Sequence, residues 1–185
     1  MGERKIFNWI VLGIVLAGLI IDAPSLLSQE NQEKKIKIIY PDEPPNLLIP
    51  DQIERLSVPG SVDWTDSGYD VLAGQEITFR AQGGISLQQG NPIAYCGPDG
   101  KILNTIQQPL KDRPIGALIG RIVRLISIEV DEETGEETRN EVIEMFYIGS
   151  AANVSMSLDG RLFLGINETV VEDNDGAFSV TYISR

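Results

Sequence analysis

From about Val58 onward the chain consists of short segments in which apolar and polar residues alternate, divided by Gly, Asp and Asn. Alternation places the apolar side chains on one face of an extended strand, and the dividing residues favour turns. Clear examples are Glu76 to Gly83, Arg161 to Asn167 and Ala177 to Ser184. No segment after residue 22 has the period of an amphipathic helix. The pattern predicts an all-β fold, an antiparallel β-sandwich.

The longest apolar segment runs from Gly116 to Val130 and is rich in Ile and Val. We expect one long bent strand there, with a bulge at Gly120, because glycine inside a strand often marks a bulge. The charged residues Asp131 to Asn140 surround Gly135 and predict a hairpin tip, with Glu141 to Gly149 as the return strand. The acids of this tip lack the spacing of a calcium loop, so we assign no site to it.

The N-terminus has the pattern of a targeting segment. Arg4 and Lys5 precede an apolar run from Ile6 to Ile21. Basic residues followed by a short apolar core indicate a secretory signal peptide, here residues 1–28. An uncleaved single-span membrane anchor is the alternative, since the run is close to the length that spans a bilayer. Either reading predicts export, with the domain periplasmic, secreted or anchored facing outside the cytoplasm.

Residues 29–57 are predicted to form a stalk or linker. Pro41 to Pro50 contains four prolines, which block helix and central strand and favour a semi-extended chain. Lys35 to Tyr40 could add an edge strand before it. The predicted organisation is therefore a signal or anchor segment at 1–28, a Pro-rich stalk at 29–57 and a folded domain at 58–185.

The composition excludes several classes of function. The net charge of −12 argues against nucleic-acid binding, because phosphates would be repelled. The chain contains no histidine, which excludes Ser-His-Asp and Cys-His catalysis and most zinc sites. The single Cys96 can form no internal disulfide, and we expect it to be a small buried residue rather than a nucleophile.

The loop between the last two predicted strands is rich in acids and amides. It contains Asn167, Glu168, Asp173, Asn174 and Asp175. Oxygen donors crowded on a loop between strands are what a calcium ion requires, and they also bind sugar hydroxyls. The same residue types form ordinary turns, so the composition alone leaves both readings open.

Four segments resemble, in the right order, the PA-IL-like galactophilic lectin domain, a bacterial module. They are VPGSVDWTDSGYDVLAGQEITFRAQG (Val58 to Gly83), GPDG (Gly97 to Gly100), PIGALIGRI (Pro114 to Ile122) and GRLFLGINE…DNDGAFSV (Gly160 to Val180). The resemblance covers nearly all of the predicted domain. It implies a galactose-binding-domain-like β-sandwich of jelly-roll type, in agreement with the strand pattern.

The resemblance also implies a site in which one calcium ion bridges protein and galactose. Its ligands would be the side chains of Glu168, Asp173 and Asn174, with main-chain carbonyls at Val170 or its neighbour and near Leu87. Calcium takes roughly six to eight oxygen ligands, and sugar hydroxyls can complete the set. The chain departs from the family pattern in having Glu168 for an aspartate, a shorter loop and no histidine in the middle loop. Gln107 or Gln108 would have to contact the sugar instead.

The leading hypothesis is an exported, non-catalytic carbohydrate-binding module for a galactoside-type ligand, with calcium as its candidate cofactor. Trp64 and Tyr69 could stack on a sugar ring, but core packing is the commoner role, since aromatic residues dominate sandwich cores. The alternative is a cell-envelope interaction domain that has kept the sandwich and lost the sugar site, with an envelope protein as its partner. A glycosidase would need a carboxylate pair, and Asp63 and Asp66 lie in a polar loop without signs of a cleft. We therefore expect no enzyme.

Overall fold

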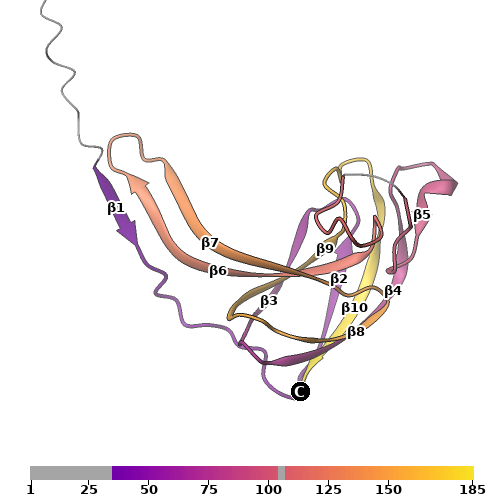
Figure 1. Cartoon of the computed structure of the whole chain (residues 1–185), viewed down its shortest axis with the longest axis horizontal. Helices are drawn as coiled ribbons and strands as arrows, with labels where there is room; N and C mark the ends of the chain where they lie inside the picture. The colour runs from indigo at the N-terminus through magenta and orange to yellow at the C-terminus, as the bar shows by residue number, and fades with distance from the viewer. Residues whose placement is uncertain (1–34, 104–106) are drawn as a thin grey trace, which may run out of the picture. The chain divides into compact units, whose positions relative to one another are not determined.

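The computed structural model describes residues 35–103 and 107–185, which form strands and one short 3-10 helix (Figure 1). The elements, in chain order, are β1 (Ile36–Ile39), β2 (Ile53–Pro59), β3 (Trp64–Val71), β4 (Glu76–Ser86), η1 (Pro92–Ala94), β5 (Tyr95–Cys96), β6 (Leu118–Asp131), β7 (Glu137–Tyr147), β8 (Ala151–Ser155), β9 (Gly160–Ile166) and β10 (Asp175–Ser184).

The strands form two five-stranded sheets, and every pairing within them is antiparallel. The first sheet has the order β1-β6-β9-β3, with β7 paired to β6. The second has the order β2-β10-β4-β5, with β8 paired to β4. This arrangement confirms the predicted antiparallel β-sandwich.

The core lies between the two sheets and follows the alternation in the sequence. In β9, Leu162 and Leu164 are fully buried, whereas Arg161 and Phe163, which alternate with them along the strand, are only partly buried. Phe178 and Val180 of β10 are likewise fully buried in the same cluster. Each buried large apolar side chain contributes about 1.5–3 kcal/mol to folding, so this interface dominates the stability of the domain.

The predicted long strand and its return strand are confirmed as the β6–β7 hairpin, which Figure 1 shows as a long curved ribbon. The prediction of a bulge at Gly120 was wrong, because the register of the hairpin shifts between Leu125 and Ser127. Packing explains the glycine instead. A Cβ atom at Gly120 would lie 2.4 Å from the ring of Phe146, so only glycine leaves room for that ring.

The charged hairpin tip is also confirmed. The backbone N–H of Gly135 donates to the carbonyl of Asp131 at 2.8 Å, and Gly135 has a φ of 72°. The carboxylate of Asp131 accepts from the N–H groups of Glu133 and Thr134. These bonds close the turn within the tip itself.

The packed unit begins before Val58. β1 pairs with the far end of β6, as an edge strand. Leu48 is buried to 2% exposure in the core, and its N–H donates to the carbonyl of Asp70 at 3.1 Å. β2 then pairs along β10. Part of the segment predicted as a stalk therefore lies on the sandwich, because Leu48 supplies core surface and the adjacent backbone finds partners there.

The predicted signal or anchor segment at 1–28 lies outside the described residues. Across 35–103 and 107–185, no helix has the length and apolar character needed to span a bilayer.

Candidate functional site

Four chain segments meet at one end of the sandwich because of the strand register. Ser86 at the end of β4 pairs with Asp175 at the start of β10. The N–H of Gly60, just after β2, donates to the carbonyl of Gly176 at 2.9 Å. The loop 167–174 leaves β9 at the same end, so the acid- and amide-rich residues lie among the ends of four strands, β2, β4, β9 and β10.

Glu168 and Asn174 form the buried centre of this loop. Their exposed fractions are 9% and 6%. The amide nitrogen of Asn174 donates to Oε2 of Glu168 at 2.8 Å and to the carbonyl of Gly60 at 3.1 Å. The side-chain oxygen of Asn174 is buried and has no hydrogen-bond partner. A buried acceptor without a partner carries a free-energy cost, which a bound cation or hydroxyl would remove.

Asp173 lies close enough to Glu168 for their negative charges to interact. Burial raises the pKa of Glu168; the hydrogen bond from Asn174 opposes this rise, and the charge of Asp173 adds to it. The side chain of Asp173 itself is exposed. Because the charge of Asp173 disfavours the ionised form of Glu168, a bound cation would lower the energy of the ionised pair.

The remaining predicted ligands belong to three other positions, and two of their segments are hydrogen-bonded to the loop 167–174. The carbonyl of Asp173 accepts from the N–H of Gln89 at 2.7 Å, which ties the loop that begins at Leu87 to the acidic loop. The carbonyl of Gln107 accepts from the N–H of Thr169 at 3.1 Å, so Gln107 also contacts the loop. Val170 is 46% exposed on the loop surface. The structure therefore brings Glu168, Asp173 and Asn174 together and attaches the segments of Leu87 and Gln107 to them.

Asn167 has a different role from its neighbours. It is fully buried, and its amide nitrogen donates to the carbonyls of Leu110, Arg113 and Pro114. Its side-chain oxygen accepts from the N–H of Leu110 at 2.8 Å. Both polar atoms of its side chain are used in fixing the loop 110–114, so Asn167 supports the site rather than supplying a free ligand. The sequence offered no signal that distinguished it from Asn174.

Two further predicted candidates are engaged elsewhere. The hydroxyl of Tyr69 donates to Glu54 at 3.0 Å and accepts from Gln52. The ring of Trp64 is covered by the guanidinium of Arg121, whose central carbon lies 4.4 Å from the ring centroid. None of these interactions involves a residue of the loop 167–174. Of the two roles considered for Trp64 and Tyr69, sugar stacking and packing, these contacts favour packing.

The two carboxyl groups considered for glycoside hydrolysis lie in different surroundings. Asp63 is exposed, and Asp66 is paired with Arg161 at 2.8 Å. Partial burial would raise the pKa of Asp66, but the hydrogen bonds from Arg161 and Gly68 outweigh that effect and lower it. A carboxyl group held ionised in this way is a poor proton donor.

Cys96 is buried and free, as predicted. Burial raises the pKa of its thiol to about 11, with a smaller upward contribution from the charge of Glu168. The thiolate is therefore not accessible near neutral pH, which is consistent with a packing role.

The donor set fits calcium better than a transition metal. Among residues 35–103 and 107–185, no three His, Cys, Asp or Glu side chains lie together so that they could hold a metal ion. Glu168 and Asp173 supply two carboxylates, and the remaining donors near them are amide and carbonyl oxygens. Calcium accepts such mixed oxygen sets, whereas zinc and similar ions require imidazole or thiolate.

Comparisons with other proteins do not place the chain in a family. No protein-family model matches it, and no curated protein is significantly similar in sequence. Among solved structures, it is similar to one described as "EclA N-terminal domain; PllA-like lectin", with 21% sequence identity and a TM-score of 0.47. The match covers 71% of this chain and 95% of that one. We infer neither family membership nor function from this similarity, and the PA-IL-like resemblance stays a prediction.

Proposed function

We propose that this chain is an exported, non-catalytic carbohydrate-binding module whose ligand is held at the loop 167–174 with the help of calcium. Glu168, Asp173 and Asn174 supply the side-chain oxygens of the ion site. Backbone carbonyls near Val170 and Leu87 complete the protein part, and Gln107 lies at the edge where a sugar would extend. The galactoside type of the ligand rests on the sequence resemblance, and export rests on the N-terminal pattern of residues 1–28.

One observation carries the proposal. The side-chain oxygen of Asn174 is buried without a partner, the nitrogen of the same amide donates to the buried carboxylate of Glu168, and the charge of Asp173 acts on that carboxylate. An orphaned acceptor beside two carboxylates is unfavourable in a site that serves only as a turn. A calcium ion would satisfy the oxygen and relieve the repulsion at once. When bound, the ion would also offer positions to vicinal sugar hydroxyls.

The test is thermal unfolding of the full chain with calcium titrated against EDTA. A ligand that binds only the folded state stabilises it by about 2.7 kcal/mol at a hundredfold excess over its dissociation constant. For a domain of this size that stabilisation raises Tm by several degrees. Asp173→Asn should abolish the rise, whereas Glu172→Gln, an exposed acid of the same loop, should retain it.

A second titration tests the sugar. With calcium present, a methyl galactoside should raise Tm further, and with EDTA present it should not. Absence of any shift at millimolar calcium would sink the calcium part of the proposal. A calcium shift without any response to galactosides would leave an ion site and remove the galactoside assignment.

A second candidate function, an envelope interaction domain, is favoured by the apolar surface of the first sheet. Ile143 and Met145, two residues apart on β7 and so on one face of it, are 44% and 37% exposed, and all residues of β1 are exposed. Apolar side chains gathered on an exposed sheet often mark a protein contact. If this is the function, Ile143→Asp should abolish capture of an envelope protein by the full chain and leave the calcium response unchanged. Capture that survives Ile143→Asp would contradict a role for this surface.

A further inference from the structure

A second polar recess lies at the opposite end of β9 from the Glu168 loop. Arg161 stands near the start of β9 and Asn167 follows its end, so at ~3.3 Å per residue the two are about 20 Å apart along the strand. A groove of 590 Å³ lies beside Arg161. Its walls include Glu43, Pro44 and Pro45 on one side, and Asp70, Leu125 and Arg161 on the other.

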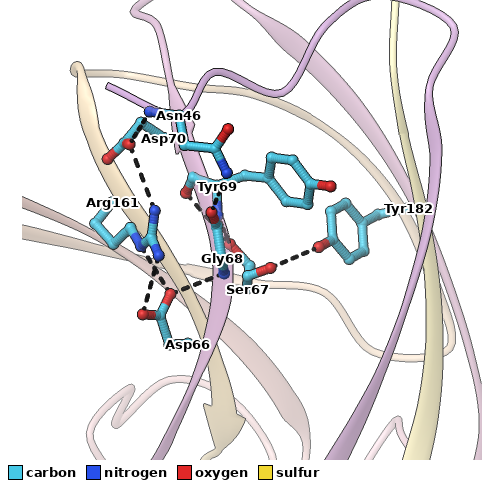
Figure 2. Close-up of polar contacts among 8 residues, drawn as sticks. All are labelled: Asn46, Asp66, Ser67, Gly68, Tyr69, Asp70, Arg161 and Tyr182. Atoms are coloured by element: carbon cyan, nitrogen blue, oxygen red, sulfur yellow. Dashed lines mark hydrogen bonds and ion pairs between the residues drawn. The ribbon is translucent and has the colours of Figure 1, made fainter. Parts of the chain in front are cut away.

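Arg161 is held at this groove by two carboxylates of β3 (Figure 2). Its Nε and Nη2 donate to Asp66 at 2.8 and 3.2 Å, and its Nη1 donates to Asp70 at 3.4 Å. The register of β3 against β9 shifts between Asp66 and Asp70, where Gly68 has a φ of 85°. The irregularity allows both acids to reach one guanidinium. Arg161 remains 32% exposed, so it keeps donor capacity toward the groove.

The opposite wall is also fixed. The N–H of Asn46 donates to the carboxylate of Asp70 at 2.8 Å, and its side-chain amide donates to the carbonyl of Gly68 at 2.8 Å. The N–H of Asp70 in turn donates to the carbonyl of Asn46, and Leu48 anchors the segment in the core. The Pro-rich wall is thus bonded to β3, and the groove exists before any ligand arrives.

The chemistry of the groove favours a neutral ligand with many hydroxyl groups. Its volume lies within the range of roughly 300–1,000 Å³ typical of small-molecule sites. Among the lining side chains, the two carboxylates of Glu43 and Asp70 outnumber the single guanidinium of Arg161 and would repel an anion. A cation would have to approach Arg161, whose charge faces the same space. Hydroxyl groups both donate and accept, so they can bond to the acids and to Arg161 together.

We propose that this groove is a second saccharide-binding site, specific for neutral sugars and independent of calcium. Asp70 and Glu43 accept hydrogen bonds from sugar hydroxyls, and Arg161 donates to a hydroxyl oxygen. Pro44, Pro45 and Leu125 provide apolar surface for the C–H face of the ring. The site goes beyond the proposed function, since it shares no residue with the Glu168 loop and does not depend on it.

The test measures binding of the full chain, in EDTA, to three immobilised trisaccharides of matched size. They are a neutral one (cellotriose), a cationic one (deacetylated chitotriose) and an anionic one (trigalacturonate). Galactotriose and mannotriose extend the neutral set. EDTA removes any calcium-dependent contribution, so failure of the first site cannot mimic failure of the groove. We expect at least one neutral sugar to be retained at least tenfold more strongly than either charged one.

Four variants test whether the retention belongs to the groove. Arg161→Gln and Glu43→Arg should each reduce it at least tenfold; Glu43 is exposed, so its substitution leaves folding intact. Arg139→Gln removes an arginine from an unrelated exposed pair with Glu141 and should leave retention unchanged. Asp173→Asn should also have no effect. Absence of neutral-sugar retention, preference for a charged trisaccharide, or retention that both groove variants preserve would overturn the proposal.

Discussion

The amide nitrogen of Asn174 donates to Oε2 of Glu168 at 2.8 Å, while the oxygen of the same amide has no partner. The two residues lie at opposite ends of the loop 167–174, and both are buried. One hydrogen bond therefore closes the loop, and the orphaned oxygen beside it marks the place where a ligand would be favoured.

Replacing Asn174 by alanine removes this closure. The variant loses the bonds to Glu168 and to the carbonyl of Gly60, and it leaves the Glu168 carboxylate buried without that donor. We expect the free energy of unfolding in urea to fall by about 2 kcal/mol. Glu172→Ala, in the same loop but exposed, should change it by less than about 0.5 kcal/mol. Equal effects of the two changes would contradict a closing role for Asn174.

Calcium affinity should depend on pH through Glu168. The folded-state pKa of this group lies above its ordinary value of 4.5, chiefly because of burial. A carboxyl group must lose its proton to bind the ion, so affinity should fall as pH drops through the raised pKa, with proton release on binding. Calorimetry at about pH 5 and about pH 7 in buffers of different ionisation heat measures both effects. Affinity that is constant over this range would contradict Glu168 as a ligand.

Without calcium, the same shift has the opposite sign for stability. In the window above 4.5, the folded state binds more protons at Glu168 than the unfolded state does. The contribution of this group to stability is therefore present below 4.5 and is lost as pH rises through the folded-state pKa. Urea unfolding in EDTA should show this loss in the wild type and not in Glu168→Gln. A wild-type profile identical to that of the variant would refute the assignment.

Asn167→Ala should be among the most destabilising polar substitutions in the domain. The change leaves the carbonyls of Leu110, Arg113 and Pro114 without their shared donor. We expect a loss of about 3 kcal/mol in the free energy of unfolding, because several buried groups lose their partner together. Asn153→Ala, on an exposed position of β8, serves as the matched control and should be nearly neutral. Urea unfolding of both variants measures the two free energies, and equal values would contradict the supporting role of Asn167.

The thiol of Cys96 should be inert in the native protein. It is 5% exposed, and burial raises its pKa to about 11. We expect negligible labelling by iodoacetamide at about pH 8 in buffer and full labelling in denaturant, since the thiolate is the reactive form. Rapid native labelling would show that the segment around β5 opens readily.

The strand pattern predicted most of the sandwich because alternation reports directly on which face of a strand is buried. The hairpin of β6 and β7, the closing strands β9 and β10 and the turn at Gly135 all follow from residues near in sequence. We predicted the bulge at the wrong residue because the sequence shows that Gly120 has no side chain but does not show which neighbour needs that space. At Gly120 the reason is the ring of Phe146, a residue that reaches it only across the hairpin.

The sequence by itself determined the all-β class and the segment that gathers Glu168, Asp173 and Asn174, because both depend on local alternation and on residues of one loop. Only the tertiary structure decided that Asn167 supports the loop 110–114 while Asn174 keeps an unpaired oxygen, although both are asparagines of the same loop. It alone also placed Asn46 and Asp70 in contact and so formed the groove at Arg161. Hydrogen-bond partners distant in sequence make these distinctions, and no local pattern encodes them.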